Sequence, residues 1–454
     1  MCAPTNKTDA VDDVGLSNQQ PLEQAVAPWR GKPLVEGASP LKTFFVMIYC
    51  HFSIALLCMN VLFDLVIFGL PAWLFYAIGL LSNRLYLRIT TWIINFTTPV
   101  VFFQPMMLSG TKIYCNDVNL LSECSRTDSL LLANHGSRID WMVGMFCGFS
   151  RYFASQTCER IRVGFVCEAI IGIMPIVGWY RKLVANDIFV WRSFKQDAPT
   201  ITNNIETFHK AETNRMLFLS PEGVVVDFSP KDVEYIHACR TFCEDQNYKP
   251  FDYVLTPRYK GSMCLLQQTQ KNSGPVVSIC LAYVRDGKLL NCKLLSSERS
   301  VPDIYTLNAG IGGSPVDIYI HLKRLNIAQD LNDPKAFMME NYKEKDELLR
   351  AWDKQTSAGT ASNEAWMSQF DVIQNNYLEC ALYQVGHAIL MLSVAIMFDC
   401  VHKLFAFGFL LFCLVAGSHT VGWVLGSTSK ESVPYETFVK AVLALALSSK
   451  KKVA

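Results

Sequence analysis

The stretch that decides how this chain is interpreted is LLLANHGSRIDWM, Leu130–Met142. It opens within SLLLA, residues 129–133, a short apolar run with the length and composition of a buried strand. Asn134 and His135 follow that run directly, and Asp140 comes five residues after the histidine. In α/β proteins the ligand crevice lies at the carboxyl ends of the strands. His135 and Asp140 are therefore candidate site residues.

Histidine and aspartate at this spacing suit acid–base chemistry. If a helix begins near Ser137, Asp140 lies one turn into it, and its carboxylate can turn back to accept a hydrogen bond from the His135 ring. Such a bond fixes the imidazole tautomer and leaves the other ring nitrogen to take a proton from a hydroxyl group. The bare pattern HxxxxD also occurs in ordinary surface turns. The choice between a general base and a structural turn therefore depends on the rest of the sequence.

Further strand-like runs surround this block between about residues 110 and 340. Between two of them Ile201, Ile205 and Phe208 recur at helical spacing, with Thr200 as the expected N-cap. Alternating strands and helices predict the α/β fold class, with a central mixed sheet and flanking helices. The predicted strands are SLLLA (129–133), DIFVW (187–191), RMLFLS (215–220), PVVSICLAY (275–283) and VDIYIHL (316–322).

Apolar residues are concentrated at both ends of the chain, which predicts membrane helices there. Of the 454 residues, 51% are hydrophobic and only 18% charged, a low charge content for a soluble protein. The run 41–81 is about twice the roughly 20 residues needed to cross a bilayer. Gly69 and Pro71 mark the expected turn, so two spans or a re-entrant hairpin both fit. At 85–108 the sequence favours an interfacial segment over a third span, and Asp64 is expected to contact another helix.

Apolar runs return after the α/β region. Residues 334–358 are charged and are typical of a solvated helix. The runs 380–399 and 404–426 are each long enough to cross, and an amphipathic hairpin within one leaflet is the alternative. The predicted division is a disordered tail (1–40), an N-terminal membrane hairpin with the interfacial segment (41–108), the α/β domain with its charged helix (109–358), a C-terminal membrane hairpin (359–430) and a tail (431–454).

The last four residues, KKVA, bear on location. Lys451 and Lys452 are placed as in the dilysine retrieval signal of endoplasmic-reticulum membrane proteins, which is read on the cytosolic side. A generic basic tail near anionic lipid fits as well. The sequence predicts the endoplasmic-reticulum membrane with a cytosolic α/β domain; the mitochondrial outer membrane is the alternative.

Charge and cysteine usage argue against other classes of function. A formal charge of +1 gives no basic footprint for nucleic acid. The sixteen cysteines are scattered and favour reduced thiols over a disulfide framework. His237, Cys239 and Cys243 lack a fourth ligand at fitting spacing, so no metal site is predicted. The sequence gives no prediction of oligomeric state.

Four blocks, in order, resemble the membrane glycerophospholipid acyltransferases, and in particular the branch of 1-acylglycerol-3-phosphate and lysocardiolipin acyltransferases. The resemblance covers about residues 125–350. The first block, NHGSRIDWM, is similar to the family's NHxxxxD block. The other blocks are GW…IFVWR with Gly178, Trp179 and Arg192, SPEGVVVDFS with Pro221, Glu222 and Gly223, and DYVLTPRYKG with Leu255, Pro257, Arg258 and Gly261, similar to LxPRxxG.

The resemblance implies a glycerolipid acyltransferase-like fold and an acyl-CoA-dependent reaction. An acyl group would pass to the free hydroxyl, at sn-2, of a lysophospholipid such as lysophosphatidic acid. His135 would act as general base, oriented by Asp140, without an acyl-enzyme. Ser137 is the rival nucleophile, but the G-x-S-x-G elbow is absent. Acyl-CoA is a co-substrate, and no cofactor is expected.

The anionic substrates need cationic partners. Arg192, Arg258 and Lys260 are the candidates for binding the phosphate of the acceptor or of CoA, because a guanidinium matches phosphate geometry. Glu222 and Gly223 are expected to shape the acceptor loop, where glycine permits close backbone approach.

One block departs from the family pattern. PEGV carries Val224 and Val225 where the family has Thr and often Arg, so a hydroxyl and a cation are missing near the acceptor phosphate. The departure favours another or a broader acceptor, such as lysocardiolipin, lysophosphatidylinositol or monoacylglycerol. It also leaves open a non-catalytic relative that binds lipids.

Overall fold

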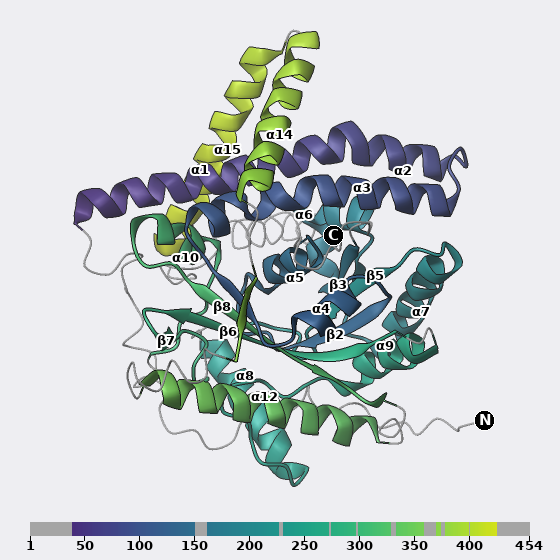
Figure 1. The fold of residues 1–454 in the computed structure, drawn as a ribbon, viewed down its shortest axis with the longest axis vertical. Coiled ribbons are helices and arrows are strands. Elements are labelled where there is room, and N and C mark those ends of the chain that lie inside the picture. The colour runs from purple at the N-terminus through teal and green to yellow at the C-terminus, as the bar shows by residue number, and fades with distance from the viewer. Residues whose placement is uncertain are drawn as a thin grey trace, which may run out of the picture.

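The computed structural model describes residues 39–149, 161–226, 230–271, 274–296, 298–327, 333–357, 369–373, 377–398 and 400–424. Within these ranges the chain forms a mixed sheet flanked by helices, with further long helices along one side (Figure 1). The predicted α/β class with a central mixed sheet is confirmed. The N-terminal tail and the dilysine motif lie outside the described residues.

The strands among the described residues join in one sheet that is parallel through its centre. They are β1 (Ile113–Cys115), β2 (Ser129–Ala133), β3 (Arg162–Glu168), β4 (Ile188–Val190), β5 (Arg215–Leu219), β6 (Val276–Arg285), β7 (Lys288–Leu289), β8 (Asp317–Arg324) and β9 (Asp371–Ile373). Their order is β4-β3-β5-β2-β6-β8-β1-β9, with β7 paired to β6. From β4 to β6 neighbouring strands are parallel, whereas β8 is antiparallel to β6. Five carboxyl ends therefore meet at one edge of the sheet, with β2 among them.

Alternate residues of β2 enter two different cores. Leu131 and Ala133 pack in the core that contains Phe146 of α5 (Asp140–Phe149). Leu130 and Leu132 point to the opposite face and pack in a second core. Because both faces are covered, β2 is buried along its whole length. Asn134, His135 and Gly136, the NHG block, follow directly at the end of this central strand.

All five predicted strands are present, as β2, β4, β5, β6 and β8. β3 was missed because it begins with a fully buried arginine rather than an apolar run. The Arg162 guanidinium donates to the carbonyl oxygens of Ala185, at 3.2 Å, and Leu87, at 3.2 Å, and to the Thr90 hydroxyl at 2.9 Å. These partners come from distant segments, so nothing in the local sequence announces a strand there.

The predicted helix around Ile201 is α7, but it begins earlier than expected. α7 spans Phe194–Lys210 with Ser193 as its N-cap, so the prediction of Thr200 as cap is wrong. Asp197 lies in the first turn, and its carboxylate accepts from the Trp191 N–H at 2.8 Å. This acidic first turn stabilises the early start.

The N-terminal hairpin turns later than predicted. α1 (Pro40–Asp64), a π-helical turn (Leu65–Gly69) and α2 (Leu70–Ala77) follow one another without a loop, so the predicted turn at Gly69 and Pro71 is wrong. Pro71 lies in the first turn of α2, directly after the π-helical turn, and the helical path continues through it. The chain reverses after α2, and α3 (Asn83–Phe102) returns alongside, as Figure 1 shows. The stretch 41–77 is long and apolar enough to cross a membrane.

The C-terminal apolar runs form a second hairpin, of α14 (Tyr377–Met397) and α15 (Val401–Val424). In Figure 1 this pair projects away from the layer of α1, α2 and α3. α14 is also long and apolar enough to cross a membrane.

The charged helix that precedes this hairpin is not the solvated helix predicted from its sequence. It is α12 (Pro334–Ser357), and one of its faces is buried against the sheet. Tyr342, Lys345, Leu349 and Trp352 lie on that face. The buried lysine among them masked the apolar pattern.

Asp64 joins the two hairpins. Its Oδ2 accepts from the Thr97 hydroxyl of α3 at 2.7 Å and lies 3.0 Å from His387 Nε2 of α14. Asp64, Thr97 and His387 are all fully buried. The expected contact of Asp64 with another helix is confirmed.

We expect Asp64→Leu to lower the free energy of unfolding by about 2–3 kcal/mol, because the Thr97 hydroxyl and the His387 ring lose a buried partner. Thermal unfolding in detergent, followed with a thiol-reactive dye, measures this, since many described cysteines are buried and react only on unfolding. Ile389→Ala, at an exposed position of α14, is the control. An unfolding temperature equal to wild type would show that the contact does not hold the hairpins together.

Candidate active site

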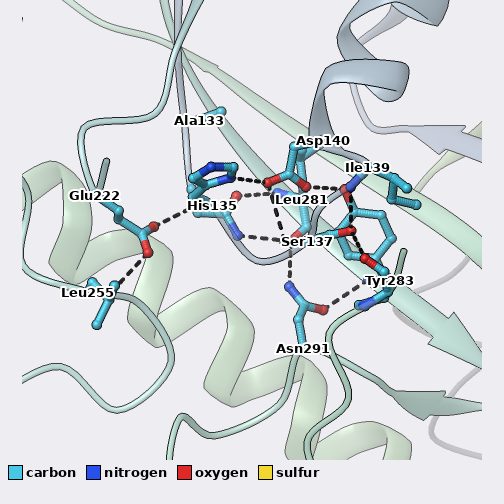
Figure 2. Close-up of polar contacts among 12 residues, drawn as sticks. Ala133, His135, Ser137, Ile139, Asp140, Glu222, Leu255, Leu281, Tyr283 and Asn291 are labelled. Atoms are coloured by element: carbon cyan, nitrogen blue, oxygen red, sulfur yellow. Dashed lines mark hydrogen bonds and ion pairs between the residues drawn. The ribbon is translucent and has the colours of Figure 1, made fainter. Parts of the chain in front are cut away.

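The NHG block turns from the end of β2 into α5 and brings His135 and Asp140 together (Figure 2). His135 Nδ1 lies 2.8 Å from Asp140 Oδ2. The helix begins at Asp140 itself, not near Ser137, so the carboxylate stands in its first turn rather than one turn in. The His135 side chain is 29% exposed, and its Nε2 has no hydrogen-bond partner among the described residues. The predicted dyad is thus formed, with one ring nitrogen available.

Asp140 is held by more than the histidine. The Tyr283 hydroxyl donates to its Oδ1, and the Ser137 N–H donates to its Oδ2 at 3.3 Å. Tyr283 is fully buried on β6, and burial raises its pKa well above the usual range, so the hydroxyl stays a donor. With both oxygens accepting, the carboxylate is fixed as the acceptor for His135 Nδ1–H. The tautomer with an unprotonated Nε2 is therefore favoured.

Ser137, the rival nucleophile, is engaged elsewhere. Its hydroxyl donates to the Pro302 carbonyl at 2.7 Å and accepts from the Ile139 N–H at 3.1 Å. The residue is fully buried. Its hydroxyl ties the loop to the segment before α10 (Ile304–Asn308), which is a structural role.

Glu222 connects three of the four blocks. Its Oε1 accepts from the His135 N–H at 2.9 Å, and its Oε2 accepts from the Leu255 N–H at 3.2 Å. The side chain is almost fully buried, and that burial raises its pKa to about 7. Glu222 therefore fixes the loop backbone directly beneath the histidine, a role in keeping with its predicted part in shaping the loop.

Two asparagines complete the loop. Asn134 exchanges hydrogen bonds with the Leu281 backbone, its Nδ2 donating at 3.0 Å and its Oδ1 accepting at 2.7 Å. Asn291 donates to the same carbonyl and accepts from the Tyr283 N–H. A Cβ at Gly136 would stand 2.7 Å from Asn291 Nδ2, so a larger residue there would displace the Asn291 side chain.

We expect the stability of the protein to fall as pH rises from about 5 to 8, in part because of Glu222. Its folded pKa of about 7 lies above the ordinary 4.5, so within that window the folded state binds a proton that the unfolded state has lost. Glu222→Gln removes this titration, so its unfolding temperature should fall less across the window. At pH 8 the free energy of unfolding of Glu222→Gln should still be about 2 kcal/mol below that of wild type, because the amide NH₂ of the glutamine faces one of the two backbone N–H donors. Identical pH profiles for the two proteins would contradict this role.

α12 supports the same loop from behind, through residues that the sequence did not reveal. The Tyr342 hydroxyl donates to the Ala133 carbonyl at 3.0 Å. Lys345 Nζ donates to the carbonyls of Leu132, at 2.6 Å, and Ile279, at 2.7 Å. Lys345 is fully enclosed, and desolvation lowers its pKa to about 8. These bonds fix the end of β2 and the neighbouring part of β6 beneath His135.

The predicted phosphate-binding residues are brought only partly together. Arg192 Nη2 donates to the Gly223 carbonyl at 2.8 Å and pairs with Glu168 Oε2 at 3.1 Å. Gly223 has φ +72°, and a Cβ there would lie 3.5 Å from Arg258 Nε. The two arginines thus approach Gly223 from different segments.

Arg258 and Lys260 are both exposed. The Arg258 N–H donates to the Pro221 carbonyl at 2.9 Å, and its guanidinium lies 3.3 Å from the Tyr235 hydroxyl. Lys260 lies in the first turn of α9 (Tyr259–Lys271). The geometry thus joins Arg258 to the loop of Pro221, Glu222 and Gly223, the PEG loop.

Within the described ranges no three His, Cys, Asp or Glu side chains are grouped so that they could hold a metal ion. Cys239 and Cys243 lie on α8 (Pro230–Asp245), where both contact Thr256.

Curated proteins similar to this chain are acyltransferases. A probable 1-acyl-sn-glycerol-3-phosphate acyltransferase 5 from Arabidopsis thaliana is 24% identical over 272 residues, 59% of this chain and 61% of that protein. Lysocardiolipin acyltransferase 1 from Danio rerio is 24% identical over 270 residues, 58% and 60% of the two chains. Lysophosphatidylinositol acyltransferase 10 from Caenorhabditis elegans is 23% identical over 227 residues, which are 49% of this chain and 52% of that protein.

The predicted resemblance to glycerophospholipid acyltransferases is confirmed by these relatives. The chain spans 61%, 60% and 52% of their respective lengths. No protein-family model matches the chain, and no solved structure matches it.

Proposed function

We propose that this protein is a membrane-bound acyltransferase that moves a fatty acyl group from acyl-CoA to the free hydroxyl, at sn-2, of a lysophospholipid. The observation that carries the proposal is the His135–Asp140 pair, in which a fixed carboxylate orients a partly exposed imidazole. The Nε2 of that imidazole has no hydrogen-bond partner among the residues that the structure describes. The names of the similar proteins support the same reaction class.

The reaction follows from the available ring nitrogen. The acceptor hydroxyl donates its proton to His135 Nε2 as its oxygen attacks the thioester carbonyl carbon. The tetrahedral intermediate collapses, the carbon–sulfur bond breaks, and the CoA thiolate takes the proton from the imidazolium. Asp140 stabilises the imidazolium between the two steps. No acyl-enzyme forms, in keeping with the engaged hydroxyl of Ser137.

The cationic side chains near Gly223 would bind the acceptor. Arg192 and Arg258 would hold the phosphate of the lysophospholipid, and Lys260 would add charge for it or for CoA. Glu222 positions this loop relative to His135 through its two backbone hydrogen bonds. Metal and cofactor have no part in the proposed steps.

The apolar helices would keep the enzyme at its substrate. α14 and the stretch 41–77 are long and apolar enough to cross a bilayer, where lysophospholipid dissolves. The location proposed for the enzyme is the endoplasmic-reticulum membrane, with the α/β domain in the cytosol.

An acyl-transfer assay on membranes that carry the full-length protein tests the proposal. Labelled oleoyl-CoA is offered with a panel of lysophospholipids and with monoacylglycerol, and free oleate replaces the thioester in a second arm. We expect diacyl phospholipid from the thioester alone, with one CoA thiol released per product. No product above membranes that lack the protein, on any acceptor, would overturn the proposal.

A further inference from the structure

Glu168 stands beside the cations that the proposed function assigns to the acceptor phosphate. It is the last residue of β3, and it pairs in register with Val190, the last residue of β4. Arg192 follows two residues later, so the carboxylate and the guanidinium leave neighbouring parallel strands at the same edge. Their charged atoms lie 3.1 Å apart, and the side chains are 45% and 32% exposed. The pair is accessible to a ligand at the mouth of the site.

This pair is linked to the catalytic histidine through the PEG loop. The Arg192 guanidinium that pairs with Glu168 also donates to the Gly223 carbonyl at 2.8 Å. The preceding residue, Glu222, accepts from the His135 N–H at 2.9 Å. An acceptor with its hydroxyl on His135 would therefore bring a nearby phosphate to Gly223 and Arg192. Glu168, 3.1 Å from Arg192, would then lie beside that phosphate.

A carboxylate at this position has opposite effects on two classes of head group. A phosphomonoester approaches a charge of −2 at neutral pH, because its second pKa is about 6. A phosphodiester carries only one negative charge, so the Glu168 carboxylate repels it less. Glu168 also offsets part of the positive charge of the Arg192 guanidinium. The hydroxyls of a polyol such as glycerol or inositol can donate to the carboxylate, which gives a charge-assisted hydrogen bond. A repulsive group at a binding site is a common means of specificity.

We propose that Glu168 is a specificity-determining residue that selects lysophospholipids with a polyol phosphodiester head group over those with a phosphomonoester. The inference rests on the proposed function and names the acceptor class for that same site.

Glu168→Gln tests the proposal, because it keeps the shape of the side chain and removes its charge. The ratio of kcat/KM for lysophosphatidylinositol to that for lysophosphatidic acid is measured on purified full-length protein. We expect wild type to favour the phosphodiester and Glu168→Gln to lower the ratio about tenfold, mainly through KM for the phosphomonoester. Glu168→Asp, which retains the charge, should stay near the wild-type ratio.

Glu123→Gln is the matched control. Glu123 of α4 (Val118–Cys124) also pairs with an arginine, Arg324, and its side chain is 44% exposed. Arg324 lies opposite Val277, at the edge of the sheet away from His135. An unchanged ratio in Glu168→Gln, with activity that still needs His135, would overturn the specificity role alone. Absence of transfer by wild type to every acceptor of the panel would overturn the proposed function as well.

Discussion

His135→Ala is expected to reduce kcat/KM for acyl transfer by at least about a thousandfold, because the acceptor hydroxyl then lacks a base. The ring makes one side-chain hydrogen bond, to Asp140, and it is partly exposed. Its loss should therefore leave the fold intact. Product formation from oleoyl-CoA and lysophospholipid is compared in membranes that carry equal amounts of each protein, and thermal unfolding checks that both are folded.

Ser137→Ala separates the general base from a serine nucleophile. The variant loses two loop contacts, so its unfolding temperature should fall, yet transfer should persist within about tenfold of wild type. Inactivity equal to that of His135→Ala, together with a burst of CoA release in the absence of acceptor, would instead indicate an acyl-enzyme.

Asp140→Asn is expected to lower kcat at least about a hundredfold with little change in KM. The carboxamide can still accept from His135 and Ser137, and the Tyr283 hydroxyl can turn to accept from its NH₂. What disappears is the negative charge that stabilises the imidazolium. Steady-state kinetics and a thermal unfolding curve on the same preparation measure both effects.

Tyr283→Phe is the companion variant for this test. It removes one donor to Asp140 Oδ1 but keeps the carboxylate charge, so it should lose less activity than Asp140→Asn. If the two variants lose activity equally, orientation rather than charge would be the contribution of Asp140.

The centre of the site was predictable because it is local in sequence. His135 and Asp140 are only five residues apart, and the strand before them is a continuous apolar run. Glu222 was predicted as part of the loop, but its carboxylate bonds the backbone of His135 and Leu255, partners 87 and 33 residues away. Such pairings leave no periodic signal.

The residues that the sequence did not reveal have buried polar groups with distant partners. Lys345 lies in a charged stretch typical of a solvated helix, yet its ammonium bonds strand carbonyls at least 66 residues away. β3 was not predicted for the same reason, because it begins with Arg162, a buried cation whose partners are distant in sequence. The predicted turn at Pro71 is wrong for a different reason. Proline usually ends a helix, but here a π-helical turn, Leu65–Gly69, directly precedes it and the helical path continues.

The measurement that tests the central claim most directly is the formation of diacyl phospholipid by purified wild-type protein and His135→Ala, from acyl-CoA and a lysophospholipid. The account predicts product and stoichiometric CoA with wild type, and neither with the folded variant. Equal product from the two proteins would contradict the assignment of His135 as the general base.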